Sequence, residues 1–272
     1  MNEIQTKLLE IWLDFDKACK ELNIKYVSIG GTALGALRHK GFIPWDDDMD
    51  FGMLRSDYDR FLKEAPKVLP KKYFVQDHST DPRYYYPFMK VRDSETTAIE
   101  WDTQNVKFNH GLWIDIFPFD YLPADDDLIR KNDKKFWDIL DRFALSYNVP
   151  GTTKLRGLLK PFKHFIYFLK YPSKEKAYKK MMNILTGYDS SSGYGSFCWS
   201  SHDKTKTRFK IDILNETRLE DFEGEKMPCM KRVEEYLVTC FGDWKKLPPE
   251  DQRGSHPLYK FDLSKSYKEY VK

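Results

Sequence analysis

Four acidic residues cluster in one short stretch, sixteen positions after a pair of glycines. The stretch is Asp46-Asp47-Asp48-Met49-Asp50, and the glycines are Gly30-Gly31. In an extended strand alternate side chains share a face, so Asp48 and Asp50 would project together. Like charges that close repel unless a cation lies between them, and carboxylate oxygens suit Mg²⁺ or Mn²⁺. The spacing predicts a site for such a metal ion.

A third carboxylate interrupts an apolar run. Asp115 lies within Trp113-Ile114-Asp115-Ile116-Phe117, which reads as a buried strand. A buried carboxylate is costly unless it meets a metal, another cation or a hydrogen-bond network. Three acids on neighbouring strands beside a glycine turn favour metal ions that bridge phosphate oxygens, the arrangement that phosphoryl transfer requires.

Two other interpretations of the acidic stretch stay open. Acidic runs are commonly solvated turns or helix caps. The spacing of Asp46, Asp48, Asp50 and Asp57 also fits positions 1, 3, 5 and 12 of a calcium-binding loop. The sixth position of such a loop is glycine, however, and this sequence has Phe51 there.

Basic side chains near these acids could contact a phosphate. Arg38, His39 and Lys40 precede the acidic stretch, and Lys90 and Arg92 would share one face of a strand. Phosphate anions need cationic neighbours of this kind. Helix ends and exposed strands also carry Lys and Arg for solubility alone, and His39 could be a simple helix cap.

The elements that must position these residues mix helices and strands. Apolar spacing predicts a helix over residues 4–22 that Asn23 stops, a strand over 26–29, and a helix over 32–39 that Thr32 caps. Another helix would run from Ser56 to Ala65. Further strands are predicted over residues 48–53, 86–92, 96–101 and 113–121. The fold class is therefore α+β, a mixed sheet flanked by helices.

The chain changes character after residue 122. Residues 125–185 read as helical, with Phe136 to Tyr147 at helical spacing, and residues 194–200 and 208–214 read as extended. A last helix would be stopped by Gly242. We expect a catalytic core over 1–122, a helical basic and aromatic section over 123–187, and a C-terminal section over 188–272 that packs on the core.

Composition narrows the class of protein. The 272 residues include 45 Lys and Arg against 42 Asp and Glu, with 41% hydrophobic and 32% charged residues, as in soluble globular proteins. The four cysteines form no C-x-x-C pair, so neither a zinc site nor a disulfide framework is indicated. No stretch approaches the roughly 20 apolar residues of a membrane-spanning helix. We expect a cytoplasmic protein without a nucleic-acid partner.

The segment 151–180 is strongly basic. It carries nine Lys and Arg against one acid, Glu175, interleaved with leucines and aromatic residues. This composition is typical of a segment that lies on an anionic membrane surface. A solvated basic face over a buried aromatic stripe is the alternative.

Three blocks of the sequence resemble the LicD family of phosphocholine transferases, which is related to the fukutin group. The first block runs from Gly30 to Asp50, the second from Trp113 to Asp120, and the third from Phe222 to His256. Together they frame nearly the whole chain. Residues 125–185 depart from the family's pattern.

The resemblance implies a nucleotidyltransferase-like fold and transfer of phosphocholine from CDP-choline to a sugar hydroxyl, with release of CMP. The acceptor would be a lipid-linked glycan, such as a teichoic acid or another surface glycan precursor, and the protein could then lie at the inner face of the membrane. By position, Asp48, Asp50 and Asp115 become the catalytic metal ligands, with Asp46 a further candidate in the same motif.

The resemblance also extends the set of candidate substrate contacts. The candidates from the first and third blocks and from the basic strand are Gly30, Gly31, Thr32, Arg38, His39, Lys90, Arg92, Arg253 and His256. A cage for the choline headgroup could come from Tyr84, Tyr85, Tyr86, Trp101 and Trp199. A nucleotidyltransferase that releases pyrophosphate and a non-catalytic module that binds cations or glycans are the alternative functions.

Overall fold

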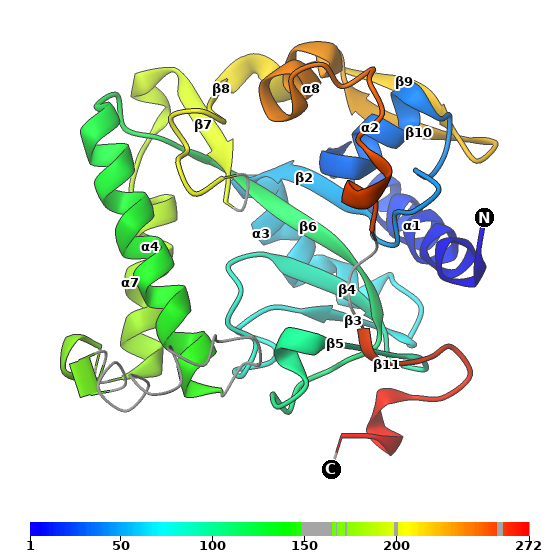
Figure 1. Cartoon of the computed structure of the whole chain (residues 1–272), viewed down its shortest axis with the longest axis horizontal. Coiled ribbons are helices and arrows are strands. Elements are labelled where there is room, and N and C mark those ends of the chain that lie inside the picture. The colour runs from blue at the N-terminus through cyan, green and yellow to red at the C-terminus, as the bar shows by residue number, and fades with distance from the viewer. Residues whose placement is uncertain (148–164, 167, 172, 199–200, 255–257, 272) are drawn as a thin grey trace.

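Two neighbouring parallel strands, β2 (Asp50–Leu54) and β6 (Leu112–Tyr121), form the centre of the sheet. The structure is a computed structural model, and it describes residues 1–147, 165–166, 168–171, 173–198, 201–254 and 258–271. Five strands follow the order β1-β2-β6-β4-β3, and β7 and β8 extend the sheet from β6 through antiparallel pairs (Figure 1). The other strands of this sheet are β1 (Val27–Ser28), β3 (Tyr73–Gln76), β4 (Met89–Asp93), β7 (Tyr194–Phe197) and β8 (Phe209–Lys210).

Helices α1 (Glu3–Glu21) and α3 (Arg55–Glu64) pack against the central strands. The rings of Trp12 and Phe15 on α1 lie 6.4 and 5.2 Å from the ring of Phe51 on β2. These contacts place the main core between α1 and one face of the sheet. The helix predicted at the N-terminus is confirmed, and Asn23 ends it with a φ of 50°.

A second layer lies beyond β1 (Figure 1). Helices α2 (Gly30–Arg38) and α8 (Val233–Phe241) contact each other there, and the antiparallel hairpin of β9 (Thr217–Phe222) and β10 (Glu225–Met230) contacts α2 and β1. Elsewhere β5 (Thr97–Glu100) pairs with β11 (Leu258–Asp262). Short 3₁₀ turns cover Ala65–Lys67, Trp101–Thr103, Ser190–Ser192, Ile211–Leu214, Glu250–Gln252 and Tyr267–Glu269.

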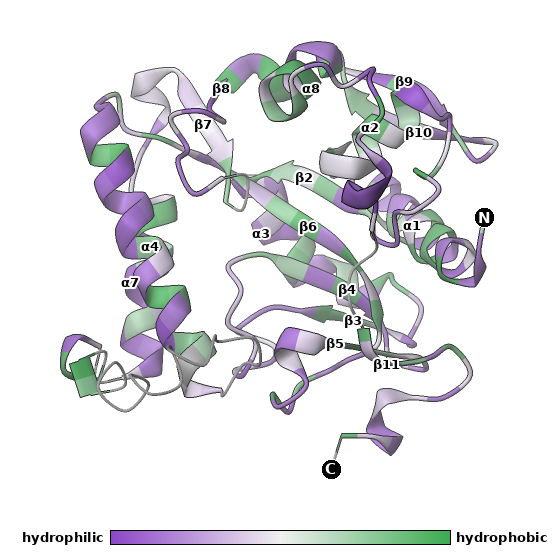
Figure 2. Ribbon diagram, viewed as in Figure 1, coloured by the Kyte–Doolittle hydropathy of each residue, from purple (hydrophilic) through white to green (hydrophobic). Residues whose placement is uncertain are grey.

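Helices α4 (Asp126–Ser146) and α7 (Lys174–Thr186) lie side by side at one edge of the molecule (Figure 1). Hydrophilic and hydrophobic residues alternate along α4 in Figure 2, and Phe136 and Phe143 are fully buried. The predicted helical spacing in this section is therefore confirmed for α4. Residues 148–164 lie outside the described residues.

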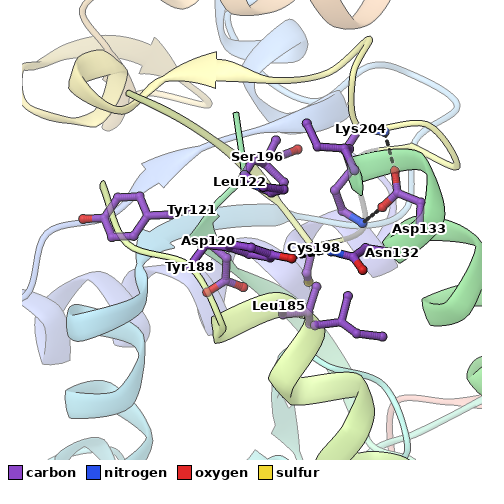
Figure 3. A pocket seen from close by; sticks show the side chains of 13 residues that line it. Asp120, Tyr121, Leu122, Asn132, Asp133, Leu185, Tyr188, Ser196, Cys198 and Lys204 are labelled. Atoms are coloured by element: carbon purple, nitrogen blue, oxygen red, sulfur yellow. Dashed lines mark hydrogen bonds and ion pairs between the residues drawn. The ribbon is translucent and has the colours of Figure 1, made fainter. Parts of the chain in front are cut away.

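The loop after β7 is fastened to α4 by a buried ion pair. The Lys204 ammonium lies 2.7 Å from a carboxylate oxygen of Asp133, and the Lys204 backbone N–H donates to the other oxygen at 2.7 Å (Figure 3). Both side chains are about 95% buried. A cavity of about 20 Å³ beside the pair has room for roughly one water molecule.

Three predicted boundaries were wrong. Strand β2 begins at Asp50, so Asp48 precedes the strand and the alternation argument does not apply to it. Helix α2 begins at Gly30, two residues before the predicted cap, because the Thr32 hydroxyl accepts from the Asp50 backbone N–H inside the first turn at 2.8 Å. Helix α3 begins at Arg55, which puts Ser56 within its first turn.

The other predicted extended segments are confirmed in part. Strand β6 matches the prediction closely, whereas β4 and β7 are shorter than expected, and residues 208–214 form a two-residue strand and a 3₁₀ turn. Strand β3 and the β9–β10 hairpin were not predicted from the sequence. Among the helices of the described residues, none combines the length and apolar composition that crossing a bilayer requires.

Candidate active site

Three charged residues form a row across three neighbouring strands. Asp50 on β2 pairs in register with Asp115 on β6, and Asp115 pairs in register with Lys90 on β4. Side chains at paired positions project from the same face of a sheet. Because the next residue, Phe51, packs against α1, this row projects from the opposite face. The sheet itself therefore brings two of the predicted acids together.

Asp115 is held by two neighbours. The Lys90 ammonium lies 2.9 Å from one carboxylate oxygen, and the Trp113 indole N–H donates to the other at 3.0 Å. Burial raises the pKa of Asp115, and the charge of Lys90 opposes that rise. The partner that a buried carboxylate needs is thus supplied by a cation and a hydrogen bond of the protein.

Lys90 and Arg92 share one face of β4, as predicted. Their charged groups lie 4.1 and 4.8 Å from the centre of the Trp113 ring, and both also pair with Glu100. Arg92 is completely buried and donates to Gln76 at 2.5 Å and to the Gly111 carbonyl at 2.8 Å. Of this pair, Lys90 is therefore the residue that lies beside Asp115. A phosphate contact by Arg92 stays a prediction.

The glycine pair makes room for acidic side chains. A Cβ on Gly30 would lie 2.7 Å from a carboxylate oxygen of Asp50, and a Cβ on Gly31 would collide with the Asp46 carboxylate. Gly30 also has a φ of 55°, which glycine adopts without strain. The first turn of α2 can approach these carboxylates because neither residue has a side chain.

The acids act on one another electrostatically. Burial raises the pKa of Asp50 well above its usual range, and the negative charges of Asp48, Asp115 and Asp46 raise it further. The other three predicted ligands thus lie near enough to Asp50 for their charges to raise its pKa. Because Asp50–Leu54 forms a strand at the centre of the sheet and Phe51 is buried, residues 46–57 do not form a calcium-binding loop, and that interpretation is wrong.

The four acids suit a hard divalent cation by their chemistry. Carboxylate oxygens are the ligands that Mg²⁺ and Mn²⁺ prefer, and the repulsion at Asp50 is what a bound cation would relieve. Among the described residues, however, no group of three or more Asp, Glu, His or Cys side chains lies close enough together to hold a metal ion. The four carboxylates are suitable metal ligands by their chemistry, but their side chains would have to move closer together to bind the ion.

The predicted basic contacts of the first and third blocks meet around Trp45. The Arg253 guanidinium lies 4.8 Å from the centre of the Trp45 ring, and the His39 ring lies 6.4 Å from it. Arg38 contacts His39 and donates to the Trp244 carbonyl at 2.9 Å. These basic side chains therefore gather at the start of the acidic stretch. His256 lies outside the described residues.

Two site residues escaped the sequence analysis. Trp113 lies two positions before Asp115, so strand alternation could have indicated that both share a face. The Tyr236 hydroxyl accepts from the Gly30 N–H at 2.9 Å. It comes from α8, more than 200 positions along the chain, and nothing in the local sequence signals that contact.

Comparisons with known proteins point to one family. Residues 23–150 match the LicD/FKTN/FKRP nucleotidyltransferase domain. The lipopolysaccharide cholinephosphotransferase LicD of Haemophilus influenzae is 29% identical, over 95% of this chain and 96% of that protein. The ribitol 5-phosphate transferase FKRP of Mus musculus is 30% identical over 100 residues, which are 35% of this chain and 17% of that protein.

An uncharacterized protein of Rickettsia typhi is 40% identical over 69 residues, which are 25% of this chain and 22% of that protein. The family match includes Gly30, Asp50 and Asp115, whose side chains or backbone meet at the centre of the site. The chain therefore carries a domain of the LicD family, which is related to the fukutin group, and over 95% of its length it resembles a LicD phosphotransferase.

Proposed function

We propose that the protein transfers phosphocholine from CDP-choline to a sugar hydroxyl of a lipid-linked surface glycan precursor, such as a teichoic acid. The hydroxyl oxygen attacks the phosphorus that carries choline, the bond from that phosphorus to the CMP oxygen breaks, and CMP leaves with the electron pair. The observation that carries the proposal is the row of Asp50, Asp115 and Lys90 beside the glycine turn of a LicD family member.

Divalent metal ions, Mg²⁺ or Mn²⁺, belong to this proposal. Asp48, Asp50 and Asp115 would hold them, with Asp46 as a further ligand. Such ions would supply positive charge that stabilises the negative charge developing on the leaving CMP.

Asp115 is also the group that we expect to take the proton of the attacking hydroxyl. Its raised pKa suits a proton acceptor, because a base works best when its pKa approaches the operating pH. Lys90 and Trp113 fix the orientation of the carboxylate from opposite sides. This arrangement costs no reorganisation when the hydroxyl arrives.

The nearest alternative within the family is a nucleotidyltransferase that releases pyrophosphate. Metal chemistry would be alike in the two reactions, so the products decide. Incubation with CDP-choline, Mg²⁺ and lipid-linked glycans should release CMP, whereas incubation with CTP and phosphocholine should release no pyrophosphate. The reverse result would establish the alternative. A purely non-catalytic module does not agree with membership of a phosphotransferase family.

Arg38→Ala is expected to weaken CDP-choline binding by roughly 10- to 100-fold while choline binding changes little. A charge-assisted hydrogen bond to the diphosphate contributes about 1.5–3 kcal/mol, and choline has no phosphate. Calorimetry with both ligands measures this difference. Arg232→Ala, which removes a surface arginine paired with Asp212, is the control and should change neither affinity. Unchanged CDP-choline affinity for Arg38→Ala would mean that Arg38 only holds the loop at Trp244.

The basic section is proposed to rest on an anionic membrane, at the inner face where a lipid-linked acceptor would lie. Phe165, Ile166, Phe168 and Leu169 are exposed, and so are Lys174, Lys176, Lys179 and Lys180 of α7. Apolar side chains beside exposed lysines favour interfacial binding over a buried aromatic stripe. The rest of 151–180 that precedes Phe165 lies outside the described residues.

Co-sedimentation with liposomes tests this attachment. Binding should require anionic lipid, weaken as salt rises, and fall in the double variant Lys176→Glu/Lys179→Glu. Lys67→Glu/Lys71→Glu makes the same change of charge at and after the 3₁₀ turn Ala65–Lys67, far along the chain from α7, and should bind like the unaltered protein. Salt-independent binding, or equal loss in both double variants, would contradict attachment through this section.

A further inference from the structure

A cavity opens beside Asp50, at the end of the site nearest α8. Its volume is about 220 Å³, below the roughly 300–1,000 Å³ of pockets that hold drug-sized ligands. Its lining includes Gly30, Asp50, Phe117, Phe197, Tyr236 and Phe241. The cavity thus adjoins the place proposed for the donor's phosphate and has room for a small group.

The aromatic walls of the cavity are fixed by packing. The Phe117 ring lies 4.4 Å from the Phe88 ring, and the Phe197 ring lies 5.2 Å from the Phe119 ring. Phe197 also lies over Gly52, where a Cβ would collide with its ring. These rings therefore stand in place before any ligand binds, which lowers the cost of binding.

The polar groups of the cavity are mostly occupied. The Tyr236 hydroxyl accepts from the Gly30 N–H at 2.9 Å, and the Cys240 thiol lines the cavity beside it. A cytosine ring buried here would leave its own donors and acceptors short of partners, which is costly. A quaternary ammonium has no N–H to satisfy and needs only aromatic faces and a negative charge. Asp50 lines the cavity, and its carboxylate would supply that charge.

We propose that this cavity receives the quaternary ammonium headgroup of the donor. The rings of Phe117, Phe197 and Phe241 surround the cation, and Asp50 lies between the headgroup and the reacting phosphate. The inference rests on the proposed function and names what selects choline. A primary ammonium would give up hydrogen bonds to water that these rings cannot replace.

This cavity differs from the cage expected from the sequence. Tyr84 and Tyr85 are buried, and Tyr85 stacks on Phe143 of α4. Trp101 packs against Tyr259 on β11, with 5.6 Å between their rings. Trp199 lies outside the described residues. The rings beside Asp50 come instead from β6, β7 and α8, which local sequence does not connect.

Phe241 offers the cleanest test because it ends α8 and is 45% exposed, so replacing it opens no core cavity. Phe241→Leu keeps apolar contact and loses the aromatic face. We expect this variant to bind phosphocholine roughly 2- to 30-fold more weakly in calorimetry, and to bind CMP as before. Phe241→Trp should bind phosphocholine at least as tightly as the unaltered protein. Val238→Ala, on the exposed side of the same helix and outside the cavity, is the matched control.

Two further outcomes separate this proposal from the proposed function. The preference for CDP-choline over CDP-ethanolamine, measured as a ratio of kcat/KM, should fall in Phe241→Leu. Equal losses for phosphocholine and CMP would place the nucleoside in the cavity and overturn the inference. Unchanged phosphocholine affinity and unchanged donor preference would also overturn it, while CMP release from CDP-choline would still support the transfer reaction.

Discussion

Changing Asp48, Asp50 or Asp115 to Asn is expected to lower the turnover of CDP-choline by roughly 10²- to 10³-fold, the scale seen when one preorganised electrostatic contact is removed. The negative charges of Asp48, Asp115 and Asp46 raise the pKa of Asp50, which shows that the four side chains interact electrostatically. Asp115 is also the proposed proton acceptor. CMP release in the presence of Mg²⁺ and a lipid-linked glycan measures the effect. Excess EDTA should abolish the same activity.

The unfolding temperature of each variant shows whether its loss of activity comes from the changed side chain or from loss of the folded structure. Without added metal, Asp50→Asn should unfold at the same or a higher temperature, because it removes a carboxylate that its neighbours repel. Asp115→Asn should be less stable, because the buried Lys90 ammonium then loses its nearest partner. Asp57→Asn, which alters an aspartate on α3, is the control and should keep full activity. Near-normal turnover in any of the three variants, or activity in EDTA, would contradict the assignment.

Lys204→Met is expected to lower the free energy of unfolding by about 3–5 kcal/mol, because Asp133 then becomes a buried charge without its ion-pair partner (Figure 3). Urea unfolding measures the change. Lys170→Met is the matched control, since the Lys170 and Asp138 pair is about one-third exposed or more on both sides and should contribute at most about 1 kcal/mol.

A double variant tests the origin of that loss. Asp133→Leu/Lys204→Met removes both buried charges, so it should be clearly more stable than Lys204→Met alone. If Lys204→Met unfolds within 1 kcal/mol of the unaltered protein, or if the double variant is no better than the single one, the pair does not fasten the β7 loop to α4.

Elements that depend on the spacing of nearby residues were predicted correctly from the sequence. The 4–22 spacing predicted α1 with its stop, and the apolar run around Asp115 predicted β6. The boundary errors at Thr32 and Ser56 have one physical origin. Both residues are good helix caps in isolation, but contacts with β2 and the end of that strand set where each helix starts.

Pairings between distant strands could not be predicted. Period 2 correctly placed Lys90 and Arg92 on one face of β4. Only the β4–β6 register, however, puts Lys90 beside Asp115. Lys90, which the sequence suggested as a phosphate contact, therefore forms an ion pair with Asp115 inside the protein. Strand β3 was missed because it has only four residues. The β9–β10 hairpin was missed because charged residues interrupt its apolar ones, and the second layer that it joins forms only when the chain has folded.

The parallel pairing of β2 with β6 bears on how the protein assembles. Asp50 and Asp115 are neighbours across that pair although 65 positions separate them, and β3, β4 and β5 all lie in the intervening chain. Closing so long a loop costs conformational entropy before any contact compensates it, so the pairing belongs to the slow part of folding. A nascent chain that has not yet completed β6 holds the glycine turn and the acidic stretch without Asp115. The candidate site can therefore form only after the central strands have met, and we expect a chain that ends before β6 to be inactive.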